Sequence, residues 1–275
     1  MRGTLLVSPL EMLEDVKSAA DLVDRKPGPG SGPGDVLQVG TCGFRSTKYE
    51  YARLLSCVEI QHTFYQPPMI KTLERWRSEM PDDFEFTLKA WQLITHESRS
   101  PTYKRLRRKL TEREAKDSGG FRATPIVKEA WDATLLCAKA LQARTVLFQC
   151  PASFEPTKPN LKALEKFFSK ADRAGLNFCW EPRGSAWTNE IVKSLCRDLD
   201  LWHVVDPFAR ATVTPEKCYF RLHGRVRWRY TYEEGELEEL AEMIPADRLA
   251  YVFFNNITMI EDAAKFREIT KGLRK

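Results

Sequence analysis

The sequence has no long hydrophobic run, since no apolar stretch approaches the roughly 20 residues needed to cross a bilayer. Its first residues, Met1–Val7, contain only a short apolar run and no small-residue cleavage site, so we expect neither a membrane anchor nor a secretory signal. The seven cysteines are odd in number, form no CxxC pair and lie mostly in apolar runs. This usage is typical of buried thiols in a reducing compartment and predicts a cytoplasmic protein without a disulfide framework.

Several motifs with a known mechanism are also absent. There is no Walker loop, GxGxxG, GxSxG or HExxH, so nucleotide cradling, serine hydrolysis and zincin chemistry lack their usual signals. The four histidines are too few for a multi-histidine zinc cluster at the predicted strand ends. No organic cofactor is indicated, and any metal would be held mainly by carboxylates, which favours magnesium or manganese. The candidate ligands for such a metal are Glu59, Glu181 and Asp206.

What the sequence has is eight short apolar runs, each of which ends on or beside a polar residue. The runs are Val36–Gly40, Cys57–Gln61, Phe84–Lys89, Thr145–Gln149, Asn177–Glu181, Trp202–Asp206, Cys218–Leu222 and Leu249–Phe254. Most intervals can hold a helix, and helices are predicted at Thr47–Leu55, Met69–Met80, Pro125–Leu141, Asn160–Ala174, Asn189–Leu199, Gly235–Ile244 and Ile260–Lys271. Only a loop fits between Asp206 and Cys218. This alternation predicts an α/β fold, a TIM-like (β/α)8 barrel, whose active site lies at the carboxyl ends of its strands.

Two segments fall outside the barrel pattern. Residues 8–24 read as an amphipathic helix that begins with a capping box at Ser8 and Glu11, and the proline- and glycine-rich linker Lys26–Gly34 follows. Residues 1–34 are therefore predicted to be a helical appendage to a barrel domain over 35–275, and this appendage either docks on the barrel or binds a protein partner. The second segment is a long insertion at about 91–124, between the third and fourth strands.

The insertion carries most of the excess positive charge. Its six basic residues between 99 and 109, with no acid among them, exceed the net charge of +5 of the whole chain. A local basic cluster favours contact with a polyanion, and the alternative is a solvated helix face or loop. The predicted binding residues within it are Arg105, Arg107 and Arg108.

Two carboxylates are the first candidates for chemistry. Glu59 lies inside an apolar strand pattern, where it needs a partner, and Lys89 at the end of the next strand is its predicted counterion. Glu181 ends the fifth strand. Two carboxylates that face one cavity can divide acid and base roles or hold a metal. The alternatives are a structural ion pair between Glu59 and Lys89, and carboxylates that only anchor Arg183 and Arg221.

The seventh strand ends in Arg221-Leu222-His223-Gly224, which offers a phosphate-binding guanidinium and a proton-transferring imidazole. The predicted catalytic residues are Glu59, Lys89, Glu181, Arg221 and His223. Polar and aromatic residues near the strand ends are predicted to bind the substrate, namely Thr41, Tyr65, Gln149, Arg183, Trp187, Asp206, Tyr230 and Asn255. Packing of the aromatic residues, and a turn at Asn255, are the structural alternatives.

Taken in order, these motifs resemble the domain of unknown function 72 (DUF72, YecE-like) family. The resemblance rests on Val39–Phe44, Val58–Ile60, Thr63–Tyr65, Phe84–Lys89, Gln149 with Pro151, Trp180–Arg183 with Trp187, Arg221–Gly224 and Phe253–Asn256. It implies a TIM barrel and carries no established activity, and its likeness to endonuclease IV and to sugar isomerases is one of fold alone. The family usually has serine where Cys42 stands and asparagine where Gln61 stands.

The leading hypothesis is an enzyme with hydrolytic or lyase chemistry on a phosphate-containing substrate, with nucleic acid favoured. Glu59 and Glu181 would then be acid/base groups or metal ligands, while Lys89 and Arg221 stabilise negative charge and His223 transfers a proton. The basic segment would hold the polyanion through phosphate contacts. Two alternatives stay open. One is an isomerase or lyase of sugars or sugar phosphates, with a phosphorylated small molecule as substrate, and the other is a non-catalytic nucleic-acid-binding protein.

Overall fold

The computed structural model describes residues 37–273, and a closed barrel of eight parallel strands forms its centre. Each strand pairs with the next along the chain, and β8 closes the barrel on β1. The strands are β1 (Leu37–Thr41), β2 (Cys57–Ile60), β3 (Glu85–Lys89), β4 (Thr145–Gln149), β5 (Asn177–Glu181), β6 (Trp202–Val205), β7 (Cys218–Leu222) and β8 (Ala250–Phe254). Every predicted run forms a strand, which confirms the barrel. The predicted N-terminal helix and linker lie outside the described residues.

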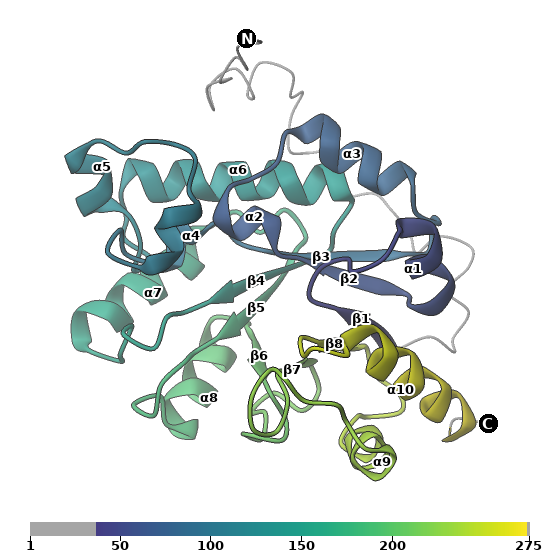
Figure 1. Cartoon of the computed structure of the whole chain (residues 1–275). Helices are drawn as coiled ribbons and strands as arrows, with labels where there is room; N and C mark the ends of the chain where they lie inside the picture. The colour runs from purple at the N-terminus through teal and green to yellow at the C-terminus, as the bar shows by residue number, and fades with distance from the viewer. Residues whose placement is uncertain (1–36, 274–275) are drawn as a thin grey trace.

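Helices surround the strands (Figure 1). The predicted ones are α1 (Lys48–Leu54), α3 (Ile70–Ser78), α6 (Pro125–Leu141), α7 (Lys158–Lys170), α8 (Asn189–Asp198), α9 (Glu234–Glu242) and α10 (Met259–Leu273). As predicted, β6 and β7 are joined without a helix. Short elements that hold too few turns to show a periodicity were not predicted, namely α2 (His62–Tyr65), α4 (Gln92–Thr95), the 3-10 helix Pro101–Arg105 and α5 (Glu112–Asp117). Within residues 37–273, no helix combines the length and the apolar character that a membrane span requires.

Side chains alternate along each strand between two apolar cores. The larger core lies between strands and helices, and the smaller one fills the barrel interior. The interior core includes Cys57, Leu147, Cys179, Tyr219 and Phe253. Because side chains two positions apart share a face, residues two positions further toward the carboxyl ends also point inward. This alternation places Glu59, Gln149, Glu181, Arg221 and Asn255 on the inner face at the mouth of the barrel.

The insertion between β3 and β4 is folded back on its own first helix, α4, and does not form an open loop. The backbone N–H groups of Gly119 and Phe121 donate to the carbonyls of Leu93 and Ile94 in α4, both at 2.8 Å. Gly119 has a φ of +77°, and a Cβ there would lie 2.2 Å from the carbonyl oxygen of His96, so only glycine fits this turn. The insertion therefore forms a fixed wall beside the third strand.

Candidate active site

The centre of the barrel mouth is the guanidinium of Arg221, which is 2% exposed. Its Nη2 donates to Oε1 of Glu59 at 2.9 Å, and its Nη1 donates to Oε2 of Glu181 at 2.6 Å. Nη1 also lies 3.4 Å from Oε1 of Gln149. Arg221 thus links the carboxylates of β2 and β5 across the barrel, and this cluster forms the floor of the site.

Glu59 is fully buried, and its carboxylate is saturated with donors. Besides Arg221, it accepts hydrogen bonds from the hydroxyl of Tyr219 at 2.6 Å, the thiol of Cys42 at 3.3 Å and the amide of Gln61. The predicted Glu59–Lys89 ion pair is not formed, because the guanidinium of Arg221 takes the place of the lysine. A carboxylate with this many partners is suited to holding Arg221 and has no free lone pair aimed at a substrate.

Glu181 lies between two guanidinium groups. Its Oε1 accepts from Nε of Arg183 at 2.6 Å, while Oε2 is bonded to Arg221. Burial raises the pKa of the Glu181 carboxyl, but the charges of Arg221 and then Arg183 outweigh burial and lower it to about 2. Glu181 is therefore an anion at neutral pH and is suited to an electrostatic role, because it has no proton to donate.

Lys89, at the end of β3, has very different surroundings. Its side chain is 6% exposed, and it makes no hydrogen bond or ion pair with any residue between 37 and 273. The amine Nζ lies 3.7 Å from the centroid of the Phe64 ring. Burial, followed by the charge of Arg221, lowers the pKa of Lys89 from 10.5 to about 7. A large share of this amine is therefore neutral, and nucleophilic, at neutral pH.

His96 belongs to this corner, and the sequence patterns did not single it out. Its ring contacts Phe64 edge-on at 4.9 Å, and its Nδ1 lies 2.7 Å from the Thr95 hydroxyl. Burial, with the charges of Lys89 and Arg183, lowers the pKa of His96 to about 3. The ring is a neutral neighbour of the amine, so it adds no competing charge to the corner formed by Lys89, Phe64 and His96.

On the opposite side, Asp206 follows β6 and holds His223, which follows β7. Oδ2 of Asp206 accepts from the backbone N–H of His223 at 2.9 Å and lies 3.8 Å from Nδ1 of its ring. Nε2 of His223 is buried and has no hydrogen-bond partner among the described residues. An imidazole anchored on one side and unpartnered on the other is suited to proton transfer with a bound molecule.

Three residues predicted to bind the substrate have structural partners. Trp187 is 2% exposed and donates its indole N–H to the carbonyl of Phe154 at 2.7 Å. Thr41 is fully buried and hydrogen-bonded to Tyr51 at 2.8 Å. Arg108 is paired with the carboxylates of Glu114 and Glu129 within the insertion. The polar group of each of these three residues therefore has a partner inside the fold.

The other predicted binding residues lie on the rim. Arg105 is exposed, and its guanidinium lies 3.4 Å from the centroid of the Tyr65 ring, while Arg107 is exposed without an ion pair to a described residue. The hydroxyl of Tyr230 donates a hydrogen bond to the carboxylate of Glu236 at 2.7 Å, and the residue is half-buried. Asn255 is half-buried, with its backbone N–H bonded to the carbonyl of Leu222.

The carboxylates at the mouth do not fit a divalent metal. Within residues 37–273 there is no group of three or more His, Cys, Asp or Glu side chains that could hold one. The guanidinium of Arg221 stands between Glu59 and Glu181 and uses the oxygens that a metal would need. The predicted ligand set of Glu59, Glu181 and Asp206 is therefore not assembled.

Comparisons with known proteins agree with the barrel. The chain matches the family described as "Protein of unknown function DUF72" over residues 45–274. A DUF72 family protein from Enterococcus faecalis is 22% identical, with a TM-score of 0.65, over 86% of this chain and 97% of that one. One from Thermotoga maritima is 23% identical, with a TM-score of 0.65, over 86% of this chain and 99% of that one. At these identities the likeness shows the fold. A comparison with curated proteins finds no similar sequence.

Proposed function

The chain belongs to the DUF72 family, and from that premise we propose that it is a lyase that uses the amine of Lys89 to attack a carbonyl group in a phosphate-containing substrate. The observation that carries the proposal is a buried amine at the carboxyl end of a barrel strand without any carboxylate bonded to it. A lysine that only stabilised the fold would be paired or would reach solvent. Active sites of these barrels lie at this end of the strands.

The chemistry balances with the groups at the mouth. Nζ of the neutral Lys89 amine forms a bond to the carbonyl carbon. The carbonyl oxygen takes up one proton from this nitrogen and one from solvent and leaves as water, which produces a cationic imine. The imine makes the adjacent C–H acidic, and Nε2 of His223 takes that proton. The electron pair of the C–H bond forms a double bond, and a phosphate on the next carbon leaves with the pair of its C–O bond. Water then hydrolyses the imine and frees Lys89.

The floor and the rim would contribute fixed charge. The charges of Arg221 and Glu181 compensate each other. They would therefore keep the electrostatic potential at Lys89 constant while the charge of Lys89 changes during the reaction. Arg183, whose side chain is 40% exposed, is the guanidinium that can reach a substrate phosphate from the floor. Arg105, seated on Tyr65, supplies a second positive charge from the insertion.

The test is reductive trapping of the imine. The protein is incubated with cyanoborohydride and a small sugar-phosphate aldehyde, and the adduct is located by peptide mass spectrometry. We expect one adduct, on Lys89, which is lost in Lys89→Met and retained in Lys166→Met, a control that removes an exposed lysine of α7. Adducts that are spread over exposed lysines and persist in Lys89→Met would overturn the proposal.

A nucleic acid is the second candidate for the phosphate-bearing substrate. Trp228, on the loop after β7, is 55% exposed and lies beside Arg229, whose guanidinium is 5.2 Å from the indole centroid. An exposed tryptophan among arginines can stack on an unpaired base. The same trapping experiment with an oligonucleotide that contains an abasic aldehyde distinguishes the two substrates, and Trp228→Ala should weaken trapping of the oligonucleotide alone.

A further inference from the structure

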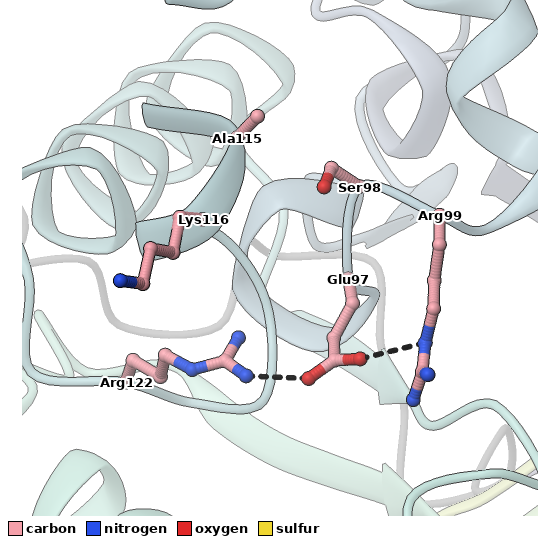
Figure 2. A pocket seen from close by; sticks show the side chains of 6 residues that line it. All are labelled: Glu97, Ser98, Arg99, Ala115, Lys116 and Arg122. Carbon is pink, nitrogen blue, oxygen red and sulfur yellow. Dashed lines mark hydrogen bonds and ion pairs between the residues drawn. The ribbon is translucent and has the colours of Figure 1, made fainter. Parts of the chain in front are cut away.

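A second concave site lies on the insertion, outside the barrel mouth. It is a pocket of about 200 Å³, lined by Glu97, Ser98, Arg99, Ala115, Lys116 and Arg122. Figure 2 shows that its walls come from two segments, the chain after α4 and the helix α5 with the turn that follows it. The pocket is smaller than the roughly 300–1,000 Å³ of sites for drug-sized ligands, so it suits a small group.

The charges in this pocket do not cancel. Glu97 is paired with both Arg99, at 2.9 Å, and Arg122, and these are the two contacts dashed in Figure 2. Lys116 makes no ion pair with any residue from 37 to 273, which leaves three cations against one carboxylate. The excess of two positive charges matches a dianion. Elsewhere in the insertion, Arg108 is flanked by two carboxylates, so its charge is balanced within the fold.

One donor group of the pocket, the guanidinium of Arg122, is held in place by the fold. Nη1 of Arg122 donates to the carbonyls of Ser118, at 2.5 Å, and Gly119, at 3.3 Å, which fixes the direction of its guanidinium. The turn that precedes Arg122 packs against the backbone of His96 and Glu97 at Gly119, where no side chain would fit. The hydroxyl of Ser98 has no hydrogen-bond partner among the described residues. A guanidinium, an ammonium group and a hydroxyl are groups that bind phosphoryl oxygens.

We propose that this pocket on the insertion binds a phosphoryl group as the dianion, with Arg122 and Lys116 as its main ligands and Ser98 as a further donor. Glu97 pairs with both arginines and keeps them in position. The phosphoryl group can come from free phosphate or from a phosphate monoester. This inference does not depend on the chemistry of Lys89.

The test is a titration of the full chain with inorganic phosphate. Binding is monitored through the ¹⁵N–¹H NMR signals of the arginine Nε groups. We expect the Arg99 and Arg122 signals to shift, with affinity that falls as salt rises. Lys116→Gln removes an exposed and unpaired charge without touching the fold, and it should weaken binding by about three- to tenfold. Lys166→Gln removes an exposed charge of α7, away from the residues that line the pocket, and should leave binding unchanged.

Parallel titrations separate the sources and the charge states. Glycerol 3-phosphate that binds more tightly than phosphate would identify a monoester as the ligand, and equal binding would identify the free ion. Acetate, a monoanion, should bind more weakly than either. Phosphate that leaves both arginine signals unmoved, or that binds Lys116→Gln as tightly as the unaltered protein, would overturn the proposal.

Discussion

The floor of the barrel mouth and the Lys89 corner each bury a cation, and they stabilise it in opposite ways. Arg221 is 2% exposed and Lys89 is 6% exposed, so both side chains are buried. For Arg221, burial alone would lower the pKa, but Glu59 and other neighbours raise it well above its usual value. For Lys89, burial prevails, and the pKa falls to about 7. Arg221 is a permanent charge of the scaffold, whereas Lys89 can exchange a proton at neutral pH.

This difference assigns separate tasks to neighbouring residues. The floor is a closed network, since Glu59 is satisfied by Arg221, Tyr219, Cys42 and Gln61. The corner presents an amine against an aromatic ring, with no acceptor bonded to it. Groups with strongly shifted pKa values in a cleft are candidates for chemistry, while fully paired ions are candidates for stability. Variants at the two regions should therefore change different properties.

The largest effect is expected when the floor is broken. Glu59→Gln leaves Arg221 buried with one carboxylate fewer, and removing one partner of a buried ion pair lowers the free energy of unfolding by about 3–5 kcal/mol. Denaturant unfolding near neutral pH measures it. Tyr219→Phe is the matched control, because it removes no charge and only the hydrogen bonds of its hydroxyl to Glu59 and Thr87, and it should lower the same free energy by about 2 kcal/mol. Equal, small losses in both variants would show that the floor is not a coupled ionic network.

Lys89→Met should have a somewhat smaller effect of opposite sign. The pKa of Lys89 falls from 10.5 in the unfolded chain to about 7 in the folded one, so between these values the unfolded chain binds more protons. The stability of the unaltered protein therefore rises with pH across this window, through Lys89. Below pH 7 we expect Lys89→Met to be more stable by about 2–5 kcal/mol, a gain that disappears toward pH 10.

Denaturant unfolding of both proteins at pH 6 and pH 9 checks this prediction. A variant that is less stable than the unaltered protein at pH 6 would contradict it, because Lys89 would then be a stabilising cation. The combination of greater stability with loss of imine trapping is expected of a residue retained for chemistry at the expense of stability.

The sequence predicted the scaffold of the site better than its contacts. The period-two pattern and the polar strand ends predicted that Lys89, Glu181, Arg221 and His223 lie at the mouth of the barrel. Alternation along a strand is enough for this prediction, because it decides which side chains face the barrel interior. Partner choice depends on distances across the barrel, which no local pattern encodes. Arg221 and Glu59 are 162 residues apart in the sequence. The pattern of adjacent strands therefore predicted Lys89 as the partner of Glu59, and it held no signal for Arg221.

The roles of Trp187 and His96 also depended on the folded insertion and loops. Trp187 follows a strand end, as a binding residue would, yet the loop after β5 turns its indole inward to stack on Phe154 at 6.0 Å. His96 is seven residues beyond the strand end, and only α4, an element too short to predict, returns it to Phe64. Neither outcome has a signal in hydrophobic periodicity. Tyr219 could have been predicted as a partner of Glu59, because Tyr219 and Arg221 are two positions apart on β7 and face the barrel interior together.

The smallest expected effect is a shift in the pKa of Lys89, and a titration of this one side chain shows whether it can exchange a proton at neutral pH. Lysine ¹³Cε signals followed against pH report the pKa of Lys89, with Lys89→Met to assign the signal. Arg183 contributes a positive charge that lowers the pKa of Lys89, so Arg183→Gln should move the midpoint upward by less than burial moved it down. In the unaltered protein we predict a midpoint of about 7. A midpoint near 10.5, the ordinary value, would show that Lys89 is a permanent cation and would contradict the proposal that its amine is a nucleophile at neutral pH.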